Sequence, residues 1–238
     1  MEGLWLEWRV MDGMDAFIQQ LSWQRPGPWL VLSLVLGGGI ARWVAVEHRA
    51  RRWWIGGYQV LVPYAALLVG AVSPRLMGLT GIDWRVTLVQ GLWVALLLLG
   101  FTVLVRMAWQ RGMAIFPETS PREDPPGGSH RFLGAVAQEF HWCFLRGGLA
   151  EIGMGIAVGP PLYLATWLAV GLALPELLGR ERSAMGRLAG GTVLLLTSVL
   201  FLYTRNFWLG ALVHWAARSL LSWGSGGRSK GPISPHRA

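Results

Sequence analysis

The chain of 238 residues is 53% hydrophobic and 14% charged, whereas soluble domains carry roughly 25% charged residues. Its 15 tryptophans and 32 glycines point to a membrane protein, because both residue types are frequent in membrane-embedded proteins. The net charge of +8 comes from arginines and one lysine that lie between apolar runs, a distribution that argues against a nucleic-acid partner. The single cysteine excludes an internal disulfide. Composition therefore predicts a membrane protein, and the arginine bias is typical of a GC-rich bacterial genome.

The first 27 residues are predicted to form an amphipathic helix at the membrane interface. Apolar residues recur at roughly helical spacing between Leu4 and Leu21, as they do in helices that lie flat on a bilayer. Acidic residues such as Glu2 and Glu7 stand where a signal peptide would have basic ones. We therefore expect segment 1–27 to be an interfacial segment of the protein.

Seven apolar runs follow, and they predict an all-α polytopic bundle of about seven transmembrane helices. A spanning helix needs roughly 17–25 residues. The runs cover 29–46, 54–72, 86–105, 132–149, 152–176, 188–204 and 207–222, the last of which is short enough that we expect it to extend into its flanks. Kinks are expected at Pro63 and at the Pro160-Pro161 pair.

A polar stretch at 109–130, rich in Pro and Gly, is predicted to be an unstructured cytoplasmic linker. It divides three transmembrane helices in 28–108 from a four-helix membrane core in 131–223. A disordered cytoplasmic tail is expected at 224–238.

Basic residues predict the orientation of this bundle. Cytoplasmic loops carry an excess of Arg and Lys. Every second connection between the predicted spans lies on the same side of the membrane, and most basic residues outside the apolar runs fall in the set of connections that includes the C-terminal tail. The opposite set contains only Arg9, Arg25, Arg75, Arg85 and Arg205. We therefore expect a bacterial inner-membrane protein with its N-terminus outside and its C-terminus in the cytoplasm.

Ionisable residues inside the predicted spans mark the candidate site. Such residues are costly in hydrocarbon and are usually functional. Glu139 and Arg146 lie at i and i+7, on one helical face with Trp142 and Cys143, while His141 points away from that face. The other histidine in an apolar run is His214, and the two imidazoles could share a depth near the bilayer midplane.

The second half of the chain also resembles a known family. Residues 202–214 read Leu-Tyr-Thr-Arg-Asn-Phe-Trp-Leu-Gly-Ala-Leu-Val-His. They are similar to the last motif of the CPBP family (CAAX-prenyl protease and bacteriocin-processing intramembrane proteases, Abi-like), in which a polar turn precedes a helix with an essential histidine. His214 takes the place of that histidine. Phe144-Leu145-Arg146-Gly147 resembles the end of the family's Glu-Glu-x-x-x-Arg motif, and Arg146 matches its arginine. The resemblance covers about 130–222.

Several positions depart from the family pattern. With Arg146 fixing the register, the paired glutamates fall on His141 and Trp142. The histidine of the family's second motif falls on Trp167, and the polar residue four after the last histidine is Arg218. Glu139 lies one turn before Trp142 on the same face, so it is the carboxylate that could replace the lost pair.

Three functions stay open on this evidence. The leading one is a non-catalytic binding or scaffold protein that keeps the architecture of a CPBP intramembrane protease. The second is a divergent, active intramembrane endopeptidase with Glu139 as general base, His214 stabilising the oxyanion, and Arg146 retained. The third is a cofactor-binding accessory subunit of a membrane complex, with His141 and His214 as ligands of a metal or a haem-like macrocycle.

The same residues also have structural interpretations. Glu139 and Arg146 could form an intramembrane ion pair if both side chains lean together, with Glu151 as a second possible partner for Arg146. His214 could make an interhelical hydrogen bond, and Cys143 is most often a small buried hydrophobe. Because two histidines have no further ligand cluster, we expect no resident metal or cofactor. The expected partners are the lipid bilayer and a membrane protein or membrane-bound peptide.

Overall fold

The computed structural model of the chain describes residues 22–40, 48–115, 128–154, 161–180 and 184–222. In these ranges the regular secondary structure is entirely helical, which confirms the all-α prediction. Most of the expected interfacial segment and the whole tail at 224–238 lie outside the described residues. The helices are α2 (Pro26–Val35) with its π-helical continuation η1 (Leu36–Ile40), α4 (His48–Leu68), α5 (Trp84–Val86), η2 (Thr87–Gly91), α6 (Leu92–Ile115), α7 (Gly128–Met154), α8 (Pro161–Arg180), α9 (Ala184–Thr204) and α10 (Phe207–Ser222).

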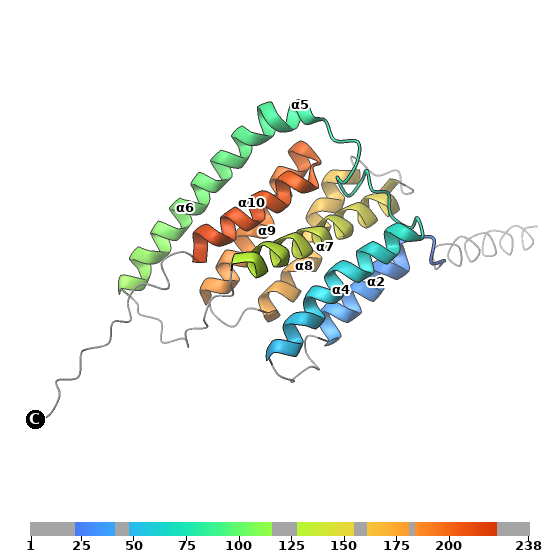
Figure 1. Cartoon of the computed structure of the whole chain (residues 1–238), viewed down its shortest axis with the longest axis horizontal. Helices are drawn as coiled ribbons and strands as arrows, with labels where there is room; N and C mark the ends of the chain where they lie inside the picture. Colours follow the sequence, from blue (N-terminus) through green and yellow to red (C-terminus); the bar gives the residue numbers. More distant parts are fainter. Residues whose placement is uncertain (1–21, 41–47, 116–127, 155–160, 181–183, 223–238) are drawn as a thin grey trace, which may run out of the picture.

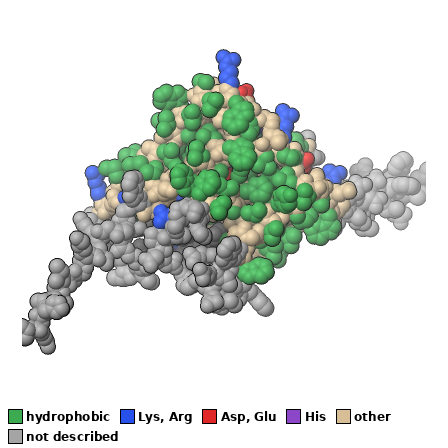
Figure 2. Space-filling model, in the orientation of Figure 1, with side chains coloured by type: hydrophobic (Ala, Val, Ile, Leu, Met, Phe, Trp, Pro, Cys, Tyr) green, Lys and Arg blue, Asp and Glu red, His purple; other side chains and the backbone are tan. Residues whose placement is uncertain are grey.

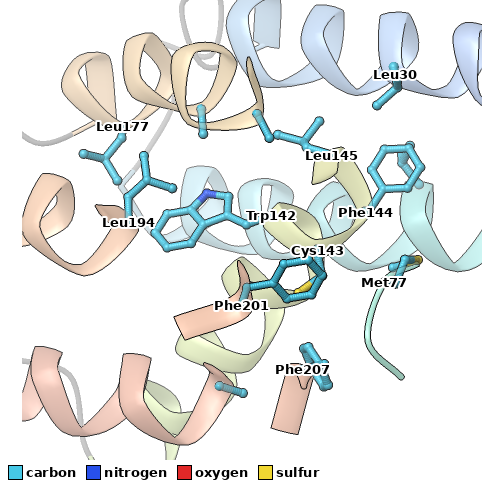
Figure 3. Packing of buried hydrophobic residues seen from close by; sticks show 14 of the residues in the cluster. Leu30, Met77, Trp142, Cys143, Phe144, Leu145, Leu177, Leu194, Phe201 and Phe207 are labelled. Carbon is cyan, nitrogen blue, oxygen red and sulfur yellow. The ribbon is translucent and has the colours of Figure 1, made fainter. Parts of the chain in front are cut away.

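Helix α7 forms the centre of the bundle. Helices α8, α10, α4 and α2 pack against it, so that it runs between α10 on one side and α4 on the other (Figure 1). Nearly every side chain between Gln138 and Ala150 is buried, as expected for a helix surrounded by others. Trp142, Phe144 and Leu145 belong to the main hydrophobic core (Figure 3). The ionisable residues of α7 therefore lie in the interior of the protein.

The predicted position of the break between spans 132–149 and 152–176 is wrong, because α7 continues to Met154 and α8 begins at Pro161. The Gly147-Gly148 pair, which lies just before the predicted break, is a packing surface. A Cβ atom on Gly147 would lie 2.9 Å from Cγ of Met77, and one on Gly148 would lie 3.2 Å from a methyl carbon of Leu30. These glycines let the loop after α4 and helix α2 approach α7 closely.

Other boundaries also differ from the sequence prediction. Helix α6 runs on to Ile115 and α7 begins at Gly128, so both ends of the predicted linker 109–130 are helical and its middle lies outside the described residues. Pro161 opens α8 rather than kinking it, in keeping with the preference of proline for the first helical turn. Helix α4 continues past Pro63. Helix α10 covers the predicted 207–222 and does not extend before Phe207, while residues 223 onward lie outside the described part of the chain.

The exterior of the described residues is markedly apolar. On α6, Trp93 is 69% exposed and Leu97 is 74% exposed, and large apolar side chains are also exposed on α4, α8 and α10. Figure 2 shows hydrophobic side chains covering the viewed face, with Lys and Arg side chains at its margins. By length and composition, two helical segments could cross a membrane, Trp84–Gly112 and Gly186–Thr204. A set of seven spans therefore remains a prediction.

Candidate functional site

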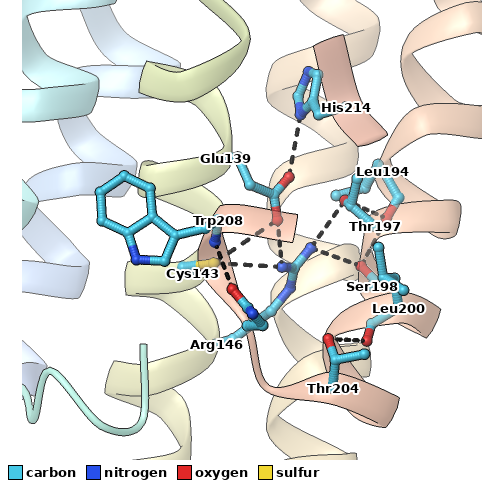
Figure 4. A network of polar contacts seen from close by, with 11 residues as sticks. Glu139, Cys143, Arg146, Leu194, Thr197, Ser198, Leu200, Thr204, Trp208 and His214 are labelled. Atoms are coloured by element: carbon cyan, nitrogen blue, oxygen red, sulfur yellow. Dashed lines mark hydrogen bonds and ion pairs between the residues drawn. The ribbon is translucent and has the colours of Figure 1, made fainter. Parts of the chain in front are cut away.

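Glu139 and Arg146 form a direct ion pair on one face of α7. They stand two helical turns apart, so their long side chains must lean toward each other to meet. Nη1 of Arg146 donates to Oε1 of Glu139 over 2.8 Å, and both side chains are essentially inaccessible to solvent. Cys143 lies between them, with its sulfur 3.8 Å from each partner. The face inferred from the helical spacing is therefore assembled as a polar centre (Figure 4).

Helix α9 completes the surroundings of the guanidinium. Nη2 of Arg146 donates to Oγ of Ser198 over 3.0 Å and lies 3.4 Å from Oγ1 of Thr197. The hydroxyl of Ser198 in turn donates a hydrogen bond to the carbonyl oxygen of Leu194 over 2.7 Å. The ring of Phe201 lies 5.1 Å from Cζ of Arg146, a cation–π distance. The adjacent Thr197-Ser198 pair inside an apolar run was the sequence signal for this contribution, and it was missed.

Helix α10 brings His214 to the other side of the carboxylate. Nδ1 of His214 lies 3.1 Å from Oε2 of Glu139. Because a carboxylate only accepts hydrogen bonds, Nδ1 carries the proton and donates it. The approach of the two helices depends on Gly210, where an added Cβ would lie 3.3 Å from Oε1 of Glu139. Both oxygens of Glu139 are therefore engaged, one by Arg146 and one by His214.

The start of α10 is fixed by Asn206. Its Oδ1 accepts from the backbone N–H groups of Trp208 and Leu209 over 2.9 and 3.2 Å, which is an N-cap. Its Nδ2 donates to Oγ1 of Thr87 on η2 over 3.2 Å. The cap thus ties α10 to η2 as well as starting the helix two turns before His214.

The turn before α10 also locks onto the loop that follows α4. The backbone N–H of Phe207 donates to the carbonyl of Gly78 over 3.0 Å. Gly78 has a φ of 72°, and a Cβ there would lie 2.6 Å from the carbonyl oxygen of Arg205. Only glycine fits this approach. The position of His214 is therefore fixed from both halves of the chain.

Trp142 closes the centre on its remaining side. Its ring stacks on the imidazole of His214 with centroids 4.9 Å apart and an interplanar angle of 26°, and it is only 3% exposed. Nε2 of His214 and Nε of Arg146 are buried without a hydrogen-bond partner. The centre is thus shielded from solvent, with two polar atoms left unsatisfied.

His141 lies outside this centre. Its Nδ1 is 3.5 Å from Oγ of Ser33 on α2, and its ring meets Tyr58 of α4 edge-on at 5.5 Å. His214 instead contacts Glu139 and Trp142. The two predicted ligands therefore face opposite sides of α7. Among the described residues, no group of three or more His, Cys, Asp or Glu side chains is placed to hold a metal ion.

The remaining predicted positions are also separate from the centre. The carboxylate of Glu151 accepts from the backbone N–H of Ser73 over 3.3 Å rather than from Arg146. Trp167, which takes the place of a histidine in the family pattern, is 37% exposed and meets Tyr163 edge-on. It does not fill the centre.

Comparisons with known proteins add no assignment. No protein-family model matches the chain, and neither the curated proteins nor the solved structures give a match. The resemblance to the CPBP family therefore stays a prediction that rests on two short motifs.

Proposed function

We propose that this chain is a multi-pass membrane protein whose Glu139–Arg146–His214 centre is structural, and that it acts by binding or scaffolding rather than by hydrolysing peptides. Two features support the membrane assignment. Large apolar side chains cover the outside of the described helices, while charged side chains are paired in the interior. Soluble monomers rarely expose so much contiguous apolar surface, and an intramembrane charge is expected to face the bundle and be paired.

One observation carries the non-catalytic assignment: both oxygens of Glu139 are occupied at zero exposure, and Trp142 lies against His214. A general base must reach a water or substrate proton within hydrogen-bond distance. In this arrangement Arg146 and His214 bind both carboxylate oxygens, and the zero exposure of Glu139 leaves water no access to the remaining lone pairs. We therefore assign Glu139, Arg146 and His214 a structural role, in which they hold α7, α9 and α10 together. This group of residues is called the brace below.

Cys143 offers a direct test, because it is the only cysteine of the chain and lies inside the centre. In native membranes that resist carbonate extraction, we expect no reaction of Cys143 with a small water-soluble maleimide until the protein is denatured. A Ser22→Cys variant is the matched positive control, since Ser22 is exposed. Rapid labelling of Cys143 in the folded protein would mean that water enters the centre and would overturn the closed assignment.

The second candidate is an active, divergent intramembrane endopeptidase. The observation in its favour is the 3.1 Å approach of Glu139 to His214, with Nε2 of the imidazole free of a hydrogen-bond partner. If this function is correct, the purified protein cleaves prenylated or membrane-bound peptides, and a Glu139→Gln variant does not. Absence of any Glu139-dependent cleavage, together with a protected Cys143, would leave the structural assignment in place.

A further inference from the structure

A second pair of opposite charges lies far from the centre along α7. A pocket of about 400 Å³ is lined by residues before and at the start of α2, by the loop after α4, and by one residue of α7. This volume falls in the range of roughly 300–1,000 Å³ that is usual for small-molecule sites. The three elements meet at one end of the molecule (Figure 1). The lining residues are Gln24, Arg25, Pro26, Val69, Gly70, Ala71 and Glu151.

The two charges of this pocket do not neutralise each other. Arg25 is exposed, and its guanidinium makes no ion pair or hydrogen bond within the described part of the chain. The Glu151 carboxylate is half-buried and, within the described residues, accepts one hydrogen bond, from the backbone of Ser73. A cationic donor and an anionic acceptor thus face one space with unused hydrogen-bonding capacity.

Both backbone walls of the pocket are fixed. On the α2 side, the N–H of Arg25 donates to the carbonyl of Ser22 over 2.8 Å. Nε1 of Trp29 donates to the carbonyl of Trp23 over 2.8 Å, and the two indole rings meet edge-on at 5.2 Å. Arg25 is therefore presented from a braced turn rather than from a free end.

On the α4 side, the helix ends in a Schellman motif. Ala71 donates to the carbonyl of Ala66 and Gly70 donates to that of Leu67, and Gly70 takes the left-handed conformation with a φ of 72°. A Cβ on Gly70 would meet nothing within 4 Å. Gly70 therefore lines the pocket with backbone atoms alone, next to open space.

The helix ends reinforce the charges of the side chains. Arg25 stands at the start of α2, where the helix dipole is positive, and Glu151 faces the end of α4, where the dipole is negative. The pocket thus has an anion-binding side and a cation-binding side. A ligand that carries both charges on one small molecule matches this layout.

We propose that this pocket binds a phosphoethanolamine group, with the phosphate on Arg25 and the primary ammonium on Glu151. Arg pairs well with phosphate, and a primary ammonium has the N–H donors that a carboxylate accepts. The group could come from a lipid headgroup or from a free phosphoethanolamine compound. The lipid source rests on the proposed membrane function. It is supported by the position of the pocket at the ends of helices and beside two tryptophans, a residue type enriched at bilayer interfaces.

Binding is tested with the full-length protein in a non-ionic detergent. Calorimetric titration compares short-chain phosphatidylethanolamine, short-chain phosphatidylcholine and free phosphoethanolamine. We expect phosphatidylcholine to bind at least tenfold more weakly than phosphatidylethanolamine, because its quaternary ammonium has no N–H to donate. Arg25→Ala and Glu151→Gln should each lower the affinity at least tenfold, whereas Arg85→Ala, an exposed arginine outside the pocket, should bind as the parent protein does.

Each outcome decides one question. Binding of free phosphoethanolamine as tightly as the lipid supports the pocket with a soluble source, and binding of the lipid alone supports it with a headgroup source. Equal affinities for the two lipids, no loss in the Arg25 and Glu151 variants, or no binding at all would overturn the proposal. If binding fails while the protein resists carbonate extraction and protects Cys143, the pocket proposal fails alone. If carbonate extracts the protein, the membrane proposal fails, and the free-compound titration still tests the pocket.

Discussion

The centre around Glu139 and the pocket around Glu151 each hold one Glu carboxylate and one Arg guanidinium, yet they use these groups in opposite ways. In the centre the two charges lie 2.8 Å apart, with no solvent exposure and further partners on α9 and α10. In the pocket, Arg25 and Glu151 face a shared space without pairing. The same chemical groups therefore form a brace where packing is complete and a candidate binding site where it is not. Both carboxylates come from α7, so the contrast lies in their surroundings.

The largest effect is expected from breaking the brace. Glu139→Leu leaves the guanidinium of Arg146 buried without its carboxylate, and this should lower the free energy of unfolding by about 3–5 kcal/mol. The measurement is unfolding in mixed micelles by SDS titration, followed by tryptophan fluorescence.

A double variant provides the control for this effect. Glu139→Leu combined with Arg146→Met removes both charges, so it should recover most of the lost stability, because a buried pair can be replaced by apolar residues at little cost. A double variant as unstable as Glu139→Leu alone would mean that the pair is not the source of the loss.

A smaller effect is expected at the contact between α10 and the carboxylate. Gly210→Ala places a methyl group 3.3 Å from Oε1 of Glu139, so either the helix or the carboxylate must shift, at about 1–3 kcal/mol. Gly171→Ala is the matched control in α8, because its methyl group would meet nothing within 4 Å. We expect the control to be neutral or stabilising in the same unfolding assay, since alanine favours helix over glycine. Equal responses of the two variants would contradict the close approach.

The cap of α10 should contribute about as much. Asn206→Ala removes the acceptor for Trp208 and Leu209, and loss of such a cap costs about 1–2 kcal/mol. Asn206→Ser restores a capping oxygen but not the donor to Thr87, so it should recover part of the stability. Unfolding midpoints of the three proteins check this order, and a serine variant no better than the alanine variant would argue against the cap.

The smallest effect is expected in the pocket. Glu151→Gln should change the free energy of unfolding by less than about 0.5 kcal/mol, as is usual for substitutions outside packed networks. Glu139→Gln is the same chemical change in the brace and should be clearly destabilising. Measured side by side, the two variants test whether packing separates the two carboxylates. A large loss in Glu151→Gln would assign its carboxylate a structural role.

The apolar runs predicted the helices well, because runs of this length are too long for β-strands and favour helices. Helical periodicity also placed Glu139, Cys143 and Arg146 on one face, since helical geometry is local. The predicted span ended at residue 149, whereas α7 continues to Met154. A glycine pair stands just before the predicted end, and a glycine that permits close packing looks like a glycine that ends a helix in sequence. What separates them is the approach of Met77 and Leu30, which belong to distant segments.

The contacts of His214 and His141 were beyond sequence reasoning. His214 lies 75 residues from Glu139 in the chain, and nothing local specifies the rotation of α10 that joins them. A common depth in the bilayer suggested that the two histidines could share a site, but depth says nothing about which side of α7 each one faces. The pocket was equally hidden, because Arg25 was seen only as an outer-loop charge and Glu151 only as a partner for Arg146.

The hydrogen bond from Phe207 to Gly78 has a consequence for the biogenesis of the protein. The first turn of α10 relies on an acceptor that is synthesised more than a hundred residues earlier. A fragment that starts at α7 contains both Glu139 and His214. It lacks this acceptor and also lacks the Thr87 hydroxyl on η2, which accepts a hydrogen bond from Asn206. The C-terminal four helices alone therefore lack two interactions that fix the start of α10, and we expect this helix, and with it His214, to be held less firmly in such a fragment.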